Sequence, residues 1–221
     1  MKEYIETKTS GKRLSPEQRE QQILERAIEY FATHGFSAST RELAKHIGIT
    51  QPLLYRYFPT KDVLIERVYN EVYCWNNSWN TQIHDPSLPI REKLIKLYIS
   101  YAHTILNKHW IRIFIFAGLN KEDINKKYLT KLREHFFIPV LKEIHQTFNS
   151  NFPEDEQQLE QEIELIWSLH ANIFYLGVRK WVYSLDIPEN IDQYIAQHVD
   201  ILLAGLPKLI DMKNKDRKNN S

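Results

Sequence analysis

The segment 39–58 constrains the fold of this chain more than any other, because it reads as two short helices joined by a glycine turn. Its sequence is Ser-Thr-Arg-Glu-Leu-Ala-Lys-His-Ile-Gly-Ile-Thr-Gln-Pro-Leu-Leu-Tyr-Arg-Tyr-Phe. Ser39 and Glu42 form a capping-box pattern at the start of the first helix, and Thr50 is placed to cap the second. Gly48 can adopt the left-handed conformation that a tight turn between helices requires. The segment therefore predicts a helix-turn-helix unit.

A longer helix is predicted on each side of this unit. Ser15 is a capping residue and Pro16 suits the first helical position, so we expect one helix to begin there. Gly35 is expected to end it as a left-handed cap. The other long helix should begin after a cap at Thr60 and run to about Trp79.

The rest of the chain shows helical periodicity and little sign of strands. It has only six glycines and no sustained alternation of apolar and polar residues. We therefore expect an all-α fold. After a loop near 81–88, helices are predicted at 89–107, 109–118, 122–149, 157–184 and 188–206.

Composition excludes several classes of function. The glycines are dispersed, so the clustered-glycine loops that cradle nucleotide phosphates are missing, and no cofactor is expected. The single cysteine, Cys74, excludes an internal disulfide and a cysteine metal cluster; we expect a small buried residue rather than a redox sensor. The polar N-terminus and the lack of a long apolar run predict a soluble cytoplasmic protein without a membrane partner.

The second helix of the unit has an outer face that suits a DNA groove. Leu54 and Phe58 lie one turn apart and must face the other helices, so the remaining side chains project outward. The alternative is a merely solvated face, but proline, leucine and two tyrosines beside an arginine are unusual there. The outward set is Gln51, Pro52, Leu53, Tyr55, Arg56 and Tyr57.

The residue types on this face match known contacts to DNA. Gln51 can pair with the N6 and N7 edge of adenine, and the apolar residues after it can touch a thymine methyl. Tyr55 and Tyr57 can donate hydroxyl hydrogens to phosphates, which positions the helix without reading sequence. Arg41 can reach guanine or a phosphate. The predicted DNA contacts are Thr40, Arg41, Thr50, Gln51, Pro52, Leu53, Tyr55, Arg56, Tyr57 and Lys61.

The stretches 23–36 and 40–64 together resemble the N-terminal domain of TetR-family transcriptional regulators. The resemblance covers about residues 16–65 and is carried by Phe31-Ala32, Gly35-Phe36, Leu43-Ala44, Gly48, Leu54-Tyr55, Tyr57-Phe58 and Lys61. The family commonly has Lys-Gly-Thr where this chain has Gln51-Pro52-Leu53, and often histidine in place of Tyr57. These departures fall on the outward face, so they leave the fold expectation intact and the operator sequence unpredicted.

The resemblance implies a domain organisation and a set of partners. Residues 14–62 would be a helix-turn-helix DNA-binding domain, joined through a long helix to a ligand-binding and dimerisation domain over 63–210. Residues 1–13 and 211–221 would be flexible tails. The implied partners are a palindromic double-stranded DNA operator, a second copy of the chain and a small-molecule effector, in a protein associated with the bacterial nucleoid.

Two of the predicted helices, 157–184 and 188–206, are the expected dimer interface. Gly177 inside a helix costs about 1 kcal/mol relative to alanine, which a close approach of another helix could offset. The alternative is that these faces form the internal core of one chain. The predicted interface residues are Ile166, His170, Phe174, Gly177, Trp181, Tyr194, His198, Ile201 and Gly205.

An aromatic set, several members of which have polar tips, is the candidate ligand pocket. Such side chains line small-molecule sites, although aromatic residues at helical spacing also form ordinary core. His103 and His109 have no acidic or cysteine partners at metal-ligand spacing, so no metal site is predicted. The candidate pocket residues are Trp75, Trp79, Tyr98, Tyr101, His103, Trp110, Phe114, Tyr128 and Phe137.

These features favour a DNA-binding repressor whose ligand moves the helix after the helix-turn-helix and so changes the spacing of the two recognition helices. One alternative is a related DNA-binding protein with an architectural or partner-recruiting role and no small-molecule inducer. An all-helical enzyme is disfavoured, because no nucleophile elbow, paired-carboxylate site or metal motif is present.

Overall fold

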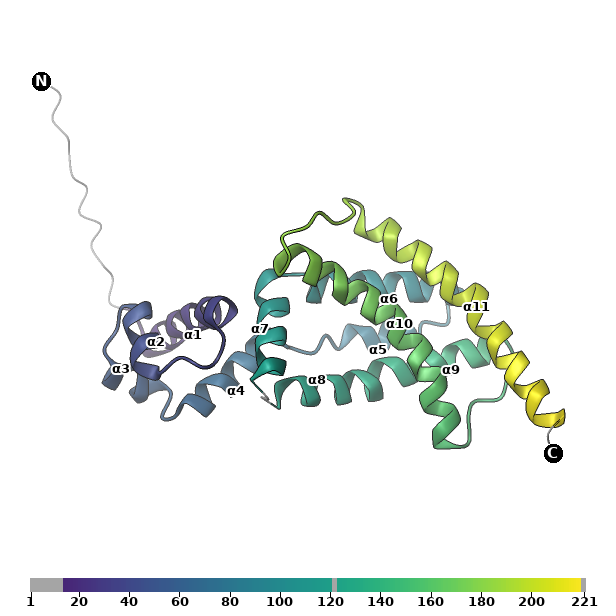
Figure 1. The fold of residues 1–221 in the computed structure, drawn as a ribbon, viewed down its shortest axis with the longest axis horizontal. Coiled ribbons are helices and arrows are strands. Elements are labelled where there is room, and N and C mark those ends of the chain that lie inside the picture. Colours follow the sequence, from purple (N-terminus) through teal and green to yellow (C-terminus); the bar gives the residue numbers. More distant parts are fainter. Residues whose placement is uncertain (1–13, 121–122, 220–221) are drawn as a thin grey trace, which may run out of the picture.

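The computed structural model describes residues 14–120 and 123–219, and within these ranges the chain is helical, without strands. The all-α prediction is confirmed. Figure 1 shows a small group of helices at the N-terminal end and a larger helical body, with α4 and α7 between them. The predicted tail over 1–13 lies outside the described residues.

The N-terminal group consists of three helices that begin and end at the residues predicted for them. They are α1 (Pro16–His34), α2 (Thr40–Ile47) and α3 (Gln51–Tyr57). Ser15 and Ser39 each form a complete capping box, and Thr50 accepts a hydrogen bond from the Leu53 amide. Gly48 is left-handed, with φ of 83°. Gly35 also has positive φ, 74°, but its ψ of −168° lies outside the left-handed helical region that we expected.

The helix that follows is shorter than predicted. Helix α4 (Lys61–Val72) stops before Trp79, and a separate short helix, α5 (Ser78–Ile83), occupies part of the predicted loop. The break coincides with a tertiary contact, because the Tyr73 hydroxyl donates to the carbonyl oxygen of Trp110 at 3.2 Å. Asn76 then accepts from the Ser78 amide and starts α5. Cys74 lies in this break and is exposed, which contradicts the buried residue predicted.

The larger body contains the remaining helices, and the predicted order is confirmed. It is built from α6 (Ile90–Ile105), α7 (Lys108–Leu119), α8 (Ile124–Leu132), the π-helical segment η1 (Arg133–Phe137), α9 (Ile138–Thr147), α10 (Glu156–Trp181) and α11 (Ile191–Asn219). The single helix predicted over 122–149 is α8, η1 and α9 in succession. Pro139 lacks an amide hydrogen, and the π-helical turn immediately precedes it.

Helix α11 is longer than the prediction of 188–206. It begins at Ile191, passes through Pro207 and remains helical to Asn219, where we expected a polar tail from 211 onward. Figure 1 shows α10 and α11 on the outer side of the body, with α6 beneath α11. No helix among the described residues is long and apolar enough to span a membrane.

Helices α7 and α10 approach each other closely inside the body. An ideal Cβ placed on Gly177 would lie 2.4 Å from Cδ1 of Ile111, closer than any side chain could be accommodated without movement. The close approach predicted at Gly177 is therefore present, but its partner is α7 of the same chain.

The far end of the body contains a buried polar network between α9 and α10. Nε2 of His145 and Oε2 of Glu162 are 2.7 Å apart, and both side chains are almost fully buried. Gln158 donates to the other Glu162 oxygen at 3.0 Å, and the Ser150 hydroxyl lies 2.8 Å from Nδ1 of His145. The Glu162 carboxylate is thus paired and hydrogen-bonded, as a buried charge must be.

Replacing Glu162 with alanine should lower the free energy of unfolding by about 3–5 kcal/mol, because His145 would be left buried without its partner. Urea unfolding measures this change. Glu164→Ala is the matched control, since Glu164 is exposed on the same helix and should change stability by less than about 0.5 kcal/mol. Equal effects of the two substitutions would contradict the structural role of the pair.

Candidate nucleic-acid interface

The reading face of α3 is presented by a buried edge of the same helix. Leu54 and Phe58 are 1% and 3% exposed and anchor α3 against the other N-terminal helices, as predicted. Of the outward set, Pro52, Tyr55 and Arg56 are exposed, whereas Gln51, Leu53 and Tyr57 are half-buried. The reading face is therefore only partly exposed to solvent.

Hydrogen bonds between side chains connect α2 to α3 across this face. Nε2 of Gln51 donates to the Thr40 hydroxyl at 3.0 Å, and the same hydroxyl lies 2.8 Å from that of Tyr55. Thr40 thus joins two residues that we predicted to contact DNA separately. This arrangement could not be predicted from the sequence, since it depends on the angle between the two helices.

A shallow depression of about 550 Å³ lies between α2 and α3, beside the reading face. Arg41, Lys45 and Gln51 are among its lining residues, and Arg41 and Lys45 are exposed. Glu42 also lines the depression, so the local surface carries two positive charges and one negative charge next to the Gln51 amide. Basic groups beside polar ones suit a DNA backbone and base edge.

Two of the predicted contacts are occupied within the chain. The Lys61 ammonium group donates to the carbonyl oxygen of Phe36, so it ties the start of α4 to the loop after α1. The Thr50 hydroxyl accepts from the Leu53 amide and serves as the cap of α3. Both groups stabilise the helix-turn-helix, and the exposed Thr50 hydroxyl, which accepts in this bond, keeps its own hydrogen to donate.

Most of the predicted pocket residues come together in the body as one buried aromatic cluster. Trp79, Tyr98, Tyr101, Trp110, Phe114, Tyr128 and Phe137 are all buried. The sequence analysis missed Tyr73 and Phe136, which are also buried and contact rings of this set. It also assigned His170 and Phe174 to the dimer interface, whereas their rings lie 5.6 Å from Tyr101 and 5.4 Å from Phe114.

Trp75 and His103 are the two predicted pocket residues that are not buried. Trp75 is half-buried at the edge of the cluster, with its ring 5.0 Å from that of Trp79 and 4.9 Å from the Lys131 ammonium. His103 is exposed, and its Nε2 lies 3.1 Å from Oδ1 of Asp192 on α11. His103 therefore faces away from the cluster, in contradiction to its predicted place in the pocket.

Among the described residues, two polar tips inside the aromatic cluster have no hydrogen-bond partner: the Tyr98 hydroxyl and the Trp110 indole nitrogen. The Tyr128 hydroxyl faces that of Tyr101 but forms no well-aligned hydrogen bond with it. Burial raises the pKa of Tyr98 and Tyr128 well above the usual value for a phenol, so both remain neutral donors. A buried donor without a partner costs about 1–3 kcal/mol, so a cluster of them calls for an explanation.

His170 is the titratable group at the edge of the cluster. Its Nδ1 lies 2.7 Å from the Tyr101 hydroxyl. Burial lowers the pKa of His170 to about 3, so the imidazole is neutral at pH 7 and its Nδ1 can accept from Tyr101. The cluster is therefore apolar and uncharged, with hydrogen-bond donors inside it.

The predicted dimer residues divide into two groups. Ile166, His170 and Gly177 are buried within the chain and face its own core, so they leave no surface for a partner. At these positions the helix faces form the internal core of one chain, which was the alternative to a dimer interface. Phe174, Trp181, Tyr194, His198 and Gly205 are half-buried, and Ile201 is 67% exposed.

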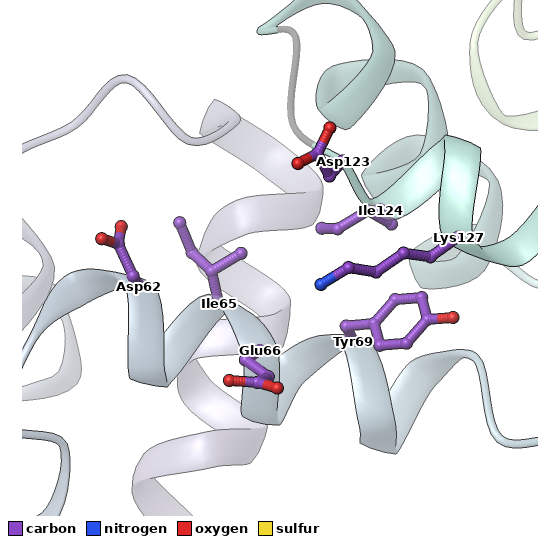
Figure 2. Close-up of a pocket in the computed structure, with 7 residues that line it drawn as sticks. All are labelled: Asp62, Ile65, Glu66, Tyr69, Asp123, Ile124 and Lys127. Atoms are coloured by element: carbon purple, nitrogen blue, oxygen red, sulfur yellow. The ribbon is translucent and has the colours of Figure 1, made fainter.

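A separate cleft of about 220 Å³ lies between α4 and α8. Asp62, Glu66 and Tyr69 line it from α4, and Asp123 and Lys127 line it from α8 (Figure 2). Among the described residues, none of these charged side chains forms an ion pair. Ile65 and Ile124, both buried, also line the cleft, so its charged side chains surround an apolar contact surface.

No group of at least three histidine, cysteine, aspartate or glutamate side chains in the described part of the chain could hold a metal ion.

Comparison with known proteins places these features in a family. Residues 23–68 match the model of the tetR family of bacterial regulatory proteins. The HTH-type transcriptional repressor KstR2 of Mycolicibacterium smegmatis is 24% identical over 198 residues, which cover 86% of this chain and 92% of that protein. A TetR-like transcriptional regulator from Rhodococcus sp. RHA1 has a similar fold, with a TM-score of 0.64 and 19% sequence identity. The match covers 87% of this chain and 100% of that protein.

Replacing His170 with asparagine should reduce the sensitivity of the fold to acid. The unfolded chain binds a proton on this imidazole below about pH 6.5, whereas the folded chain does not until about pH 3. Stability is therefore lost as pH falls through this window, by about 1.4 kcal/mol per unit. Between pH 7 and pH 5, urea unfolding of the variant should show a loss smaller by about 2 kcal/mol. Identical losses in both proteins would contradict a neutral, buried His170.

Proposed function

The chain is a DNA-binding transcriptional regulator of the TetR family, and on this premise we propose that it is a homodimeric repressor released from its operator by a small molecule. Its role is recognition and not catalysis, because the matched family consists of regulatory proteins. A protein bound to an operator works where the chromosome is, so we place it in the cytoplasm, at the bacterial nucleoid.

The observation that carries the DNA-binding part is the hydrogen-bonded face of α3. Gln51 and Tyr55 are both held by Thr40, with Arg41 beside them. We assign base reading to Gln51 and Arg41, and phosphate contacts to Tyr55 and Tyr57. Thr40, Pro52, Leu53 and Arg56 complete the surface, while Thr50 and Lys61 support it from within.

The homodimer is supported by exposed apolar side chains on α10 and α11. Ile201 is 67% exposed and Tyr175 is 53% exposed, and apolar groups on one side of a helix pair commonly mark an interface. A two-fold pairing of these helices would bury that surface as an intermolecular four-helix contact. It would also place two α3 helices for successive major grooves, about 34 Å apart on a palindromic site.

The effector site is supported by the buried aromatic cluster. Its unpartnered donors at Tyr98 and Trp110 would gain partners from a ligand with hydrogen-bond acceptors. Since the cluster carries no charged side chain, we infer a neutral and largely apolar effector. We accordingly divide the chain into a DNA-binding domain over 14–62 and a ligand-binding and dimerisation domain over 63–210.

Replacing Gln51 with alanine should weaken binding to the operator by about 1–3 kcal/mol and relax specificity at one base pair. The operator is first selected from bound genomic fragments, and affinity is then measured by fluorescence anisotropy at a fixed salt concentration. Tyr55→Phe should weaken binding to all sequences alike, because it removes a phosphate contact.

Gln193→Ala provides the matched control, since it makes the same change at an exposed position on α11. It should bind DNA as the unaltered protein does. Unaltered affinity in both Gln51→Ala and Tyr55→Phe would eliminate the proposed reading face.

Replacing Ile201 with glutamate should convert the dimer to a monomer, because a charge would be buried in an apolar contact. Light scattering measures the mass, and operator binding should weaken with it. Leu119→Glu is the control, since Leu119 is 75% exposed at the end of α7, away from α10 and α11. A dimer that persists in Ile201→Glu would place the interface elsewhere.

A further inference from the structure

Helix α7 contacts both the aromatic cluster and the DNA-binding unit, with different faces of the same helix. Trp110 and Phe114 lie four residues apart, and their stacked rings are part of the cluster. Arg112 and Phe116 are also four residues apart, and they contact the end of α1. Figure 1 shows α7 standing at the boundary between the N-terminal helices and the body. A displacement of α7 at the aromatic cluster must therefore also move the side chains that contact α1.

The Arg112 guanidinium joins the C-terminal ends of two helices. Its Nε donates to the carbonyl oxygen of Ala32, in the last turn of α1, and its Nη1 donates to that of Trp181, at the end of α10, at 3.1 Å. These carbonyl groups belong to helix ends, where intrahelical donors are lacking and partial negative charge accumulates. One cation therefore links the DNA-binding unit to the outer layer of the body.

Phe116 adds a steric contact next to this link. An ideal Cβ on Gly35 would lie 2.9 Å from Cδ1 of Phe116, so the ring rests directly on the backbone that ends α1. The Arg112 guanidinium lies 5.6 Å from the centroid of the same ring. The end of α1 is thus fixed by a charged group and an aromatic ring from consecutive turns of α7.

The other connection between the DNA-binding unit and the body runs through α4, beside an open cleft. Helix α4 follows the DNA-binding unit, but the charged cleft separates it from α8 (Figure 2). Where α4 ends, Tyr73 again contacts α7, through the carbonyl oxygen of Trp110. The Tyr73 ring also packs 5.6 Å from that of Tyr128 on α8. Helix α4 therefore contacts α7 and α8 where it ends, whereas Arg112 and Phe116 of α7 contact the end of α1 directly.

We propose that Arg112 is a positioning residue that holds the DNA-binding unit in its orientation, and that α7 transmits the effector signal to α1 through this residue. A ligand among Trp110 and Phe114 would shift α7 and so change the grip of Arg112 and Phe116 on α1. This inference rests on the proposed function for its ligand, but the orienting role of Arg112 does not require DNA or ligand to be tested.

The first experiment measures amide hydrogen exchange by mass spectrometry in the full-length protein. Arg112→Met keeps the apolar stem and removes the donors, so exchange in α1–α3 should become about tenfold faster, with α9 and the N-terminal half of α10 unchanged. Lys127→Met makes a comparable change in the α4–α8 cleft and should leave α1–α3 unchanged. Unchanged exchange in α1–α3 of Arg112→Met, or an equal effect of Lys127→Met, would overturn the proposal.

Further variants separate positioning from simple loss of structure. Arg112→Lys retains charge and donors and should restore part of the protection of α1–α3. Phe116→Leu, which keeps Arg112, should loosen the same segment and leave α9 and α10 protected. If Arg112→Met instead loses protection throughout the chain, Phe116→Leu decides the matter: no selective change in α1–α3 would count against the proposal.

The second experiment tests transmission in operator binding by a double-mutant cycle. Phe114→Leu alters the cluster, and its effect on operator affinity should disappear in the Arg112→Met background, whereas it should persist in the Lys127→Met background. Additive effects with Arg112→Met would refute transmission through α7. If the protein selects no operator at all, the proposed function fails, and the exchange experiment still tests the orienting role of Arg112.

Discussion

The position of α7 depends on its contact with Gly177, where the backbone of α10 lies directly against Ile111. A side chain at this position would require the Ile111 side chain or the helices to move. With α7 held there, Trp110 and Phe114 reach the aromatic cluster, and Arg112 reaches the ends of α1 and α10. Close-packed helices shift as units and do not deform continuously. The orientation of the DNA-binding unit thus depends on a helix that lies outside that unit.

Features set by neighbours in sequence could be predicted, and features set by tertiary contacts could not. The capping boxes at Ser15 and Ser39 and the turn at Gly48 are local, and they are found as expected. The end of α4 was misplaced because it depends on Tyr73 reaching Trp110. Phe136 was missed because η1 breaks the 3.6-residue period on which the analysis of helix faces relied. Ile166 and His170 lie on an apolar face, but periodicity does not tell whether a face meets its own chain or a second copy.

Buried polar groups are treated differently at the two ends of the body. At the far end, His145, Glu162 and Gln158 satisfy one another, which ties α9 to α10 and favours one arrangement. In the aromatic cluster, Tyr98 and Trp110 keep donors that no group in the described part of the chain accepts. Stability is therefore concentrated away from the DNA-binding unit, while the region against α7 retains unmet hydrogen-bonding capacity. Such a division suits a protein that must keep its fold while one part responds to a small molecule.

The hydrogen bonds from Thr40 to Gln51 and Tyr55 also affect how DNA is recognised. A long side chain that is already held loses less rotational freedom when it meets a base. To contact a base, however, the Gln51 amide must give up its hydrogen bond to the Thr40 hydroxyl or share that hydroxyl with the base edge. Only a base pair that offers a donor and an acceptor at the right positions can compensate for this exchange. Specificity for the operator would then have two sources. The correct base pair attracts α3, and an incorrect base pair cannot replace the hydrogen bond that Gln51 loses from Thr40.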